Sequence, residues 1–271
     1  MHPFVKKWVT VYLKCGINLI LYYRNVYPAA SFDLTTFQGF NLPQFMPMNR
    51  HPAVLEYIDE FIEDVLFKLQ RTHKITLCII TPKDYRCIET YTFDFRNFNH
   101  LGVEDPQKLR EADVYDRFRA SLNNLIQRLE KLTPIKDDSV SFELVATLIG
   151  VELGHTFDKI NHFNNNFQKL FYERDMNWVK CQPEDPYFNE SMDSEKVSSR
   201  IRTHAIIGAN IGPISIDILF ERLLVWDGSL DTVYEYEDDY YEQEQKRPYM
   251  SPSNYDSDDN KFDMVNLPSS I

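Results

Sequence analysis

The sequence lacks the cysteine pairs and the leader that are typical of secreted or zinc-binding chains. Its four cysteines, Cys15, Cys78, Cys87 and Cys181, form no CxxC pair, and the N-terminus has no charged-then-apolar signal peptide with a cleavage site. We therefore expect an intracellular protein with reduced thiols. Cys78 and Cys87 fall on predicted neighbouring strands and could approach each other. We expect them to pack as small apolar side chains rather than form a disulfide.

Catalytic motifs are also missing. There is no phosphate-binding loop and no GxGxxG, GxSxG or HExxH segment, and the seven histidines are dispersed. We therefore expect no enzyme activity, no catalytic residue and no cofactor. The best arrangement for a metal is Glu152, His155, Asp158 and His162, at steps that a helix would bring to one side. Such spacing is common by chance, so we expect no metal site there.

A basic surface is missing as well. The formal net charge is −12, and from Asp227 onward twelve acidic residues stand against three basic ones, a net of −9 that leaves −3 for everything before. Because Lys and Arg supply most contacts to phosphate backbones, we expect no tight direct binding of nucleic acid. Residues 227–271 combine high charge with few aliphatic side chains, so they cannot bury enough apolar surface to offset chain entropy. We predict one folded domain over residues 1–226 and a disordered acidic tail over 227–271.

The most apolar stretch runs from Phe4 to Pro28. Between Val9 and Tyr23 only four residues interrupt the apolar run, so a helix here would be apolar nearly all round and would need burial on several sides. Lys14 and Asn18 are two of the four, and the run is too short to cross a bilayer, so we expect no membrane span. The sequence predicts a core helix that ends before Pro28.

The remaining periodicity alternates between helical and strand spacing. We predict helices at Pro52–Gln70 and Tyr115–Leu132. We predict strands at Ile75–Ile80, Cys87–Phe95, Val140–Gly150, Ile201–Ile207 and Ile214–Leu219, with an irregular link before Pro52 and a turn at Gly208–Pro213. Segregated helices and strands of this kind indicate an α+β layer structure, with three helices packed on an antiparallel sheet.

Several segments resemble a known family in their order along the chain. They are the first-helix segment NLILYYRNVYP from Asn18 to Pro28, then Arg50–Ile58, the strand Glu89–Phe95, the helix Tyr115–Leu132, and Asn177–Val179. Over residues 4–226 the chain resembles the HORMA family, and within it the accessory subunits of translesion DNA polymerase zeta in their budding-yeast form. The resemblance implies a HORMA fold whose C-terminal part, residues 152–226, is a mobile "safety belt".

The resemblance also implies a peptide channel under the belt. Residues that match it are Tyr57, Trp178, Val179, Asn25 and Tyr27. The aromatic rings would offer flat surfaces for proline rings of a captured partner segment. Trp178 has another interpretation as an anchor that holds a loop to the core, and Tyr57 as a helix residue at the edge of the core. Each could be anchor and contact at once.

Two further surfaces follow from the resemblance. Arg222, Leu224 and Gly208 match a second surface that related subunits use for the C-terminal domain of a deoxycytidyl-transferring translesion polymerase, although Arg222 and Leu224 depart from the vertebrate pattern, which has Gln and Tyr there. Asn123 falls on the third helix, where the vertebrate form has a basic residue used in HORMA self-association. A dimer, or two copies per complex, is the corresponding expectation.

The function implied is that of a non-catalytic adaptor in translesion synthesis in the nucleus. It would capture a proline-containing segment of the catalytic subunit of DNA polymerase zeta and bridge to the deoxycytidyl-transferring polymerase. The alternative within the same fold is a spindle-checkpoint or meiotic-axis HORMA signalling protein that binds a different closure peptide. An enzyme with an unrecognised site is the alternative from another class.

Overall fold

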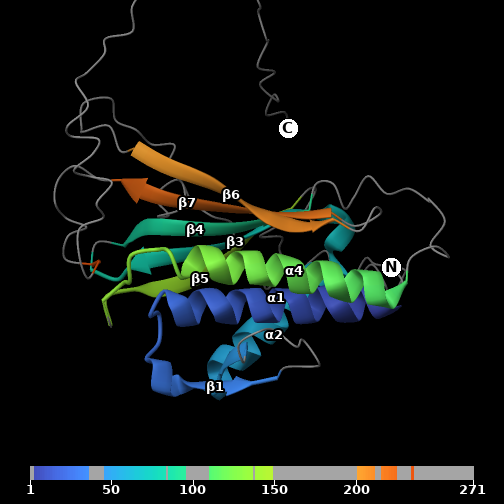
Figure 1. Cartoon of the computed structure of the whole chain (residues 1–271). Coiled ribbons are helices and arrows are strands. Elements are labelled where there is room, and N and C mark those ends of the chain that lie inside the picture. Colours follow the sequence, from blue (N-terminus) through green and yellow to red (C-terminus); the bar gives the residue numbers. More distant parts are fainter. Residues whose placement is uncertain are drawn as a thin grey trace, which may run out of the picture. The chain divides into compact units, whose positions relative to one another are not determined.

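The computed structural model describes residues 3–36, 46–83, 85–95, 110–136, 138–148, 200–210, 215–224 and 233–234. They all lie in the first of the two compact units into which the chain divides, residues 1–236 and 237–271. Within this unit the described helices α1 (Pro3–Tyr23), α2 (Pro52–Phe67) and α4 (Glu111–Leu129) lie on one side of a five-stranded antiparallel sheet (Figure 1). The predicted α+β class is confirmed.

Helix α1 is the centre of the core. Most of its described side chains are buried, as its apolar composition requires, and the exposed or half-buried ones lie mainly toward its two ends. Gly16 allows a close approach to the sheet, since a Cβ there would lie 3.1 Å from Cζ of Phe93. The one buried amide side chain of α1, Asn18, is satisfied: its Oδ1 accepts the backbone N–H of Asn49 at 2.9 Å, and its Nδ2 donates to the carbonyl of Lys14.

Helix α1 ends in a C-terminal capping motif centred on Asn25. Asn25 adopts a left-handed backbone with φ of 50°, and Val26 N–H donates back to the carbonyl of Leu21 at 3.1 Å. This is the Schellman arrangement that satisfies the last carbonyls of a helix, and asparagine is one of the few residues other than glycine that tolerates it. The predicted stop before Pro28 is confirmed.

Helices α2 and α4 each bury one stripe. Both sit close to their predicted positions, although α2 ends at Phe67 and is followed by a short 3-10 turn, Leu69–Arg71. The buried stripe of α2 is Ile58, Phe61, Ile62, Val65 and Leu66, and that of α4 is Val114, Phe118, Ser121, Leu122, Leu125, Ile126 and Leu129. Helix α4 packs on α1 and on the strand β6 (Arg200–Asn210).

The sheet joins distant parts of the chain. Its strands are β3 (Thr72–Thr81), β4 (Arg86–Asp94), β5 (Ser141–Leu148), β6 (Arg200–Asn210) and β7 (Ser215–Leu224), in the order β5-β3-β4-β7-β6. All neighbours are antiparallel, and β4 therefore lies between its hairpin partner β3 and the C-terminal strand β7. At the junction Tyr91 of β4 faces Phe220 of β7 in the register.

Two predicted irregular segments are in fact extended. The link before Pro52 contains a two-stranded ladder, β1 (Phe32–Thr35) with β2 (Met46–Asn49), in which Pro47 faces Leu34. Strand β6 continues through the predicted turn at Gly208 as far as Asn210, because a register shift between Ile206 and Ala209 absorbs the glycine into a bulge.

The chain beyond β7 returns to the core. Val233 and Tyr234 are each only 5% exposed, and Lys136 N–H donates to the carbonyl of Val233 at 2.8 Å. Both residues lie inside the segment predicted to be tail. The predicted domain boundary after Trp226 is therefore wrong for these two residues, because no apolar run in the sequence marks them.

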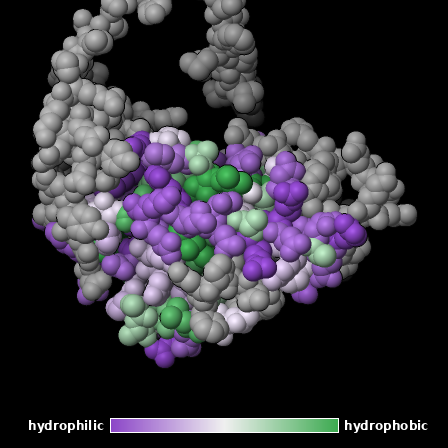
Figure 2. Space-filling model, viewed as in Figure 1, coloured by the Kyte–Doolittle hydropathy of each residue, from purple (hydrophilic) through white to green (hydrophobic). Residues whose placement is uncertain are grey.

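The thiols and the surface complete the fold. Cys15, Cys78 and Cys87 are buried thiols, and Cys78 and Cys87 pack together with Ile80, so those two are apolar side chains rather than a disulfide. Within the described ranges no helix is long and apolar enough to cross a membrane, and no His, Cys, Asp or Glu group is arranged to hold a metal. Cys181 and the segment 152–162 lie outside those ranges. The described part of the face in Figure 2 is largely hydrophilic.

Candidate functional site

Strand β5 forms one edge of the sheet within the described part of the chain. Strand β5 ends the strand order, and among the described strands only β3 pairs with it. The backbone N–H of Leu144 donates to Oη of Tyr57 at 3.3 Å and so points away from β3. Because backbone direction alternates along a strand, Phe142, Leu144 and Ala146 direct their N–H and C=O groups to this edge, which we call the β5 edge. An edge of this kind is a template for strand pairing.

Aromatic rings gather beside the β5 edge. The ring of Phe142 lies edge-on to Tyr57, at 5.9 Å between centroids, and to Tyr27, at 6.1 Å. Tyr57 comes from α2 and Tyr27 from the segment after α1, so two elements distant from β5 supply this cluster. Burial raises the pKa of both tyrosine hydroxyls, which keeps them protonated at neutral pH. Tyr57 nevertheless stays 43% exposed.

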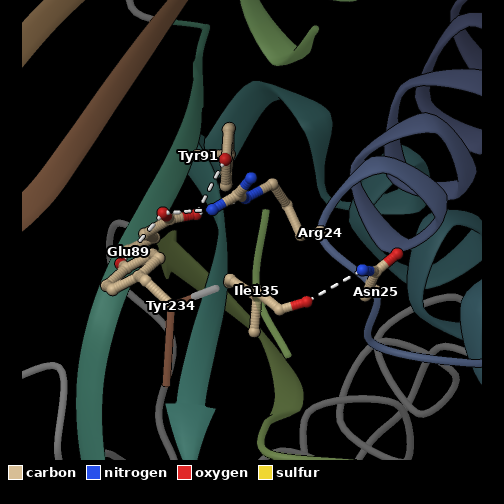
Figure 3. Close-up of polar contacts among 6 residues, drawn as sticks. All are labelled: Arg24, Asn25, Glu89, Tyr91, Ile135 and Tyr234. Atoms are coloured by element: carbon tan, nitrogen blue, oxygen red, sulfur yellow. Dashed lines mark hydrogen bonds and ion pairs between the residues drawn. The ribbon is translucent and has the colours of Figure 1, made fainter. Parts of the chain in front are cut away.

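The structure therefore brings together two of the five residues predicted for the peptide channel. A third, Asn25, ends α1, and its Nδ2 donates to the carbonyl of Ile135 at 2.8 Å (Figure 3). Its side chain serves an internal contact. Trp178 and Val179 lie outside the described residues, and their roles stay predictions.

A buried ion pair connects Arg24, just after α1, with Glu89 of β4. Arg24 donates from Nε to Oε2 of Glu89 at 2.8 Å and from Nη2 to Oε1 at 2.7 Å, and neither side chain is exposed to solvent (Figure 3). Two parallel bonds of this kind are the strongest geometry that an arginine and a carboxylate can form. The pair joins the last turn of helical hydrogen bonding in α1 to the middle of β4.

Two hydroxyls complete the shell around Glu89. Tyr91 donates to Oε2 at 2.9 Å, and Tyr234 donates to Oε1 at 3.1 Å. Burial alone would raise the pKa of the Glu89 carboxyl, but the charge and hydrogen bonds of Arg24, with help from Arg222, hold it below its ordinary value. Burial and the same carboxylate raise the pKa of both tyrosines. We call Arg24, Glu89, Tyr91 and Tyr234 the Glu89 cluster.

The residues predicted for the second partner surface lie on β6 and β7. Arg222 is 3% exposed, and its guanidinium carbon lies 3.9 Å from the ring centroid of Tyr234, so its side chain is a contact within the core. Gly208 sits in the β6 bulge, where a Cβ would come within 1.9 Å of the carbonyl oxygen of Ile216. Leu224 ends β7 opposite Arg200. Asn123, predicted for self-association, is half-buried on α4.

Sequence reasoning missed the Glu89 cluster. The available signals were an acidic residue inside the apolar strand run from Cys87 to Phe93 and an arginine at the end of an apolar helix. Since buried charges are normally paired, each should have suggested the other. Tyr234 gave no such signal, because tyrosines recur throughout the acidic segment around it.

A helical layer over this antiparallel sheet, with a C-terminal hairpin added beside β4, defines a known class. Residues 5–212 match the family model of the HORMA domain, and the chain belongs to that family. A chain of a crystal structure of the mitotic checkpoint complex has the same fold, with a TM-score of 0.56 at 14% identity over 80% of this chain and 98% of that one.

The more specific likeness is to a polymerase subunit. The chain is 45% identical over 230 residues to the DNA polymerase zeta processivity subunit of Saccharomyces cerevisiae, an alignment that covers 85% of this chain and 92% of the relative. It is 21% identical over 181 residues to the mitotic spindle assembly checkpoint protein MAD2B of Homo sapiens, covering 66% of this chain and 77% of that protein.

Proposed function

We propose that this chain is a non-catalytic accessory subunit of DNA polymerase zeta that works in translesion synthesis and DNA repair in the nucleus. The support is the 45% identity to a processivity subunit over 92% of that subunit's length. An alignment of that extent covers a whole subunit rather than one motif. This chain would not bind DNA tightly itself, because residues before 227 carry a net charge of −3 and so lack the excess of Lys and Arg that contacts phosphates.

The proposed mode of action is capture of an extended, proline-containing segment of the catalytic subunit. The observation that carries it is the β5 edge with its aromatic cluster. A captured segment would add to the sheet as a sixth strand, using the outward backbone groups of Phe142, Leu144 and Ala146. The rings of Tyr27 and Tyr57 would supply flat apolar surfaces that select proline rings.

The belt is the second part of this proposal. Residues 152–226, including Trp178 and Val179, would close over the captured segment. Of its last strands, β7 pairs with β4 and β6 pairs with β7, at the end of the sheet opposite to the β5 edge. Dissociation would require the belt to open, so the complex would be distinguished by a slow off-rate.

The proposal extends to two weaker contacts. The deoxycytidyl-transferring polymerase would bind along the β6–β7 hairpin, in which Gly208 lies beside Ile216 and Leu224 lies at the other end, opposite Arg200. The buried side chain of Arg222 would support this surface from inside. Ile207, next to Gly208, is 73% exposed and offers an apolar side chain there. A second copy of a HORMA domain would bind along α4 near Asn123.

The direct experiment is a peptide scan. Overlapping fluorescent peptides covering the polymerase zeta catalytic subunit are titrated against the full chain, alongside closure peptides of spindle-checkpoint and meiotic-axis HORMA proteins. One or a few proline-containing peptides of the catalytic subunit should bind with slow dissociation. Binding only of checkpoint or meiotic peptides would establish the alternative function, and binding of none would refute capture.

A backbone variant tests where the peptide lies. Ala146→Pro removes the Ala146 N–H, which points to the β5 edge and is not used in pairing with β3. An edge strand tolerates proline at such a position, so the fold should survive. We expect peptide binding to weaken at least about tenfold while the protein stays folded. Thr147→Ala, an exposed change on the next residue, is the matched control and should bind normally.

A further inference from the structure

The middle of the β5 edge is already occupied. Leu144 lies at the centre of Ser141–Leu148, and its edge-directed N–H is held by the side-chain oxygen of Tyr57 at 3.3 Å. Tyr57 reaches it from α2, 87 positions earlier in the chain. A side chain thus stands where the backbone carbonyl of an added strand would accept a hydrogen bond.

Strand addition and this contact compete for the same donor. In an antiparallel or parallel ladder each outward N–H donates to a carbonyl of the neighbouring strand. The single N–H of Leu144 cannot make a full bond to both a ligand carbonyl and the Tyr57 hydroxyl. A ligand strand that pairs along the whole β5 edge therefore has to displace the hydroxyl.

The surroundings of Tyr57 permit such a displacement. The residue is 43% exposed, so its ring is not enclosed by the core. Its hydroxyl makes only this hydrogen bond among the described residues, whereas the ring packs on Phe142. A rotation that carries the hydroxyl off Leu144 breaks one bond and leaves the aromatic packing available to the ligand.

We propose that Tyr57 is a displaceable plug of the β5 edge: its hydroxyl holds the Leu144 N–H in the unliganded protein and yields it to the carbonyl of the captured strand. The inference rests on the proposed function, since it concerns the ligand captured at that edge. The plug interrupts the row of edge-directed donors that would otherwise invite pairing with other extended chains. Only a segment that also gains the ring contacts would displace it efficiently.

If Tyr57 is a plug, removing its hydroxyl should strengthen peptide binding, whereas removing a ligand contact would weaken it. Tyr57→Phe keeps the ring and removes only the competing oxygen. We expect it to bind the peptide found by the scan about twofold to fivefold more tightly, the effect of releasing one modest hydrogen bond. Tyr57→Ala also removes the ring and should bind at least about tenfold more weakly. Tyr22→Phe, a half-buried tyrosine packed on Phe32, is the matched control and should bind as the parent does.

Amide hydrogen exchange gives a readout that does not need the ligand. The Leu144 amide of the free protein should exchange about twofold to fivefold faster in Tyr57→Phe than in the parent or in Tyr22→Phe. With saturating peptide, this amide should be equally protected in all three.

The outcomes separate the plug from the proposed function. Weaker binding of Tyr57→Phe would make the hydroxyl a ligand contact and overturn the plug, as would unchanged exchange or unchanged affinity. Failure of the parent protein itself to bind any catalytic-subunit peptide would refute the proposed function, and the plug with it, whatever the exchange rates.

Discussion

Glu89 and Tyr234 are 145 positions apart in the chain, yet the Tyr234 hydroxyl donates to Oε1 of Glu89 at 3.1 Å with both side chains buried. Through this bond Tyr234, ten positions beyond the end of β7, is fixed to the strand at the centre of the sheet. The same carboxylate holds Arg24 at the end of α1. A single buried charge therefore connects the first helix, the middle strand and the segment after the last strand.

The first prediction is that Glu89→Gln destabilises the fold. The substitution leaves Arg24 buried without its counter-charge, which typically costs about 3–5 kcal/mol of unfolding free energy. Urea unfolding followed by circular dichroism would measure it. Glu60→Gln, an exposed change on α2, is the control and should stay within about 0.5 kcal/mol of the parent. An equally small effect at Glu89 would mean that the pair adds no stability.

The second prediction concerns acid. The pKa of Glu89 is lower in the folded protein than in the unfolded chain, so its contribution is present above the unfolded value, about 4.3, and is lost as pH falls through the folded value. The parent should lose unfolding free energy between about pH 5 and pH 3. Glu89→Gln should lose less over that range. Parallel curves for the two proteins would contradict the assignment.

The third prediction compares two C-terminal truncations, one that keeps Tyr234 and one that removes it. Deleting residues 235–271 should leave the melting temperature and peptide binding nearly unchanged. Deleting residues 227–271 also removes Tyr234, whose ring and hydroxyl are buried, and should cost a few kcal/mol, as large core truncations do. That corresponds to a fall of roughly 5–15 °C in a domain of this size. Differential scanning calorimetry of both truncations decides the matter, and equal melting temperatures would show that Tyr234 adds nothing.

The fourth prediction concerns the two aromatic residues proposed to grip the peptide. Tyr57→Ala and Trp178→Ala should each cost on the order of 2 kcal/mol of peptide binding, seen mainly in the off-rate. The folded core should largely survive. Melting temperature and off-rate measured on the same variants distinguish this from anchoring: strongly lowered melting temperatures beside unchanged off-rates would identify core anchors. A double variant no worse than the singles would indicate that the two residues act as one unit.

The fifth prediction tests the β6 bulge. In Gly208→Ala the new methyl group would lie 1.9 Å from the carbonyl oxygen of Ile216, and that neighbour is backbone that cannot move alone. We expect a loss of about 2 kcal/mol or more, or a shift of the β6–β7 register. Urea unfolding measures the first, and amide exchange along β7 reveals the second. The exposed Ala205→Ser on the same strand should be nearly neutral.

The parts of the fold that the sequence predicted are those with a long, regular pattern. Helix α1 is apolar nearly all round, helices α2 and α4 repeat their apolar residues at helical spacing, and strands β3, β4 and β5 are apolar or alternating runs of eight to ten residues. The ladder of β1 and β2 was not predicted. Each strand has four residues, one contains Pro47, and the pairing depends on packing against α1.

Errors at the C-terminal end have a different cause. Gly208 followed by Pro213 is a typical turn signal, but the glycine serves the close approach of β6 to β7 instead. Part of the candidate site was accessible by family resemblance, which selected Tyr27 and Tyr57. The hydrogen bond between Leu144 N–H and Tyr57 could not be predicted from the sequence, because it depends on how α2 and β5 pack in three dimensions. No local pattern records such a contact.

The position of β4 in the sheet also determines how much of the fold can form while the chain is being translated. One side of β4 pairs at once with β3, but its other side pairs with β7, which begins at Ser215. While the 120 residues from Phe95 to Ile214 are translated, the nascent chain has a β3–β4 hairpin whose second edge has no native partner. Native pairing that spans so long a loop is slow to form, and unpaired strands are prone to aggregate. This polypeptide should therefore depend on chaperones until its last strand has left the exit tunnel.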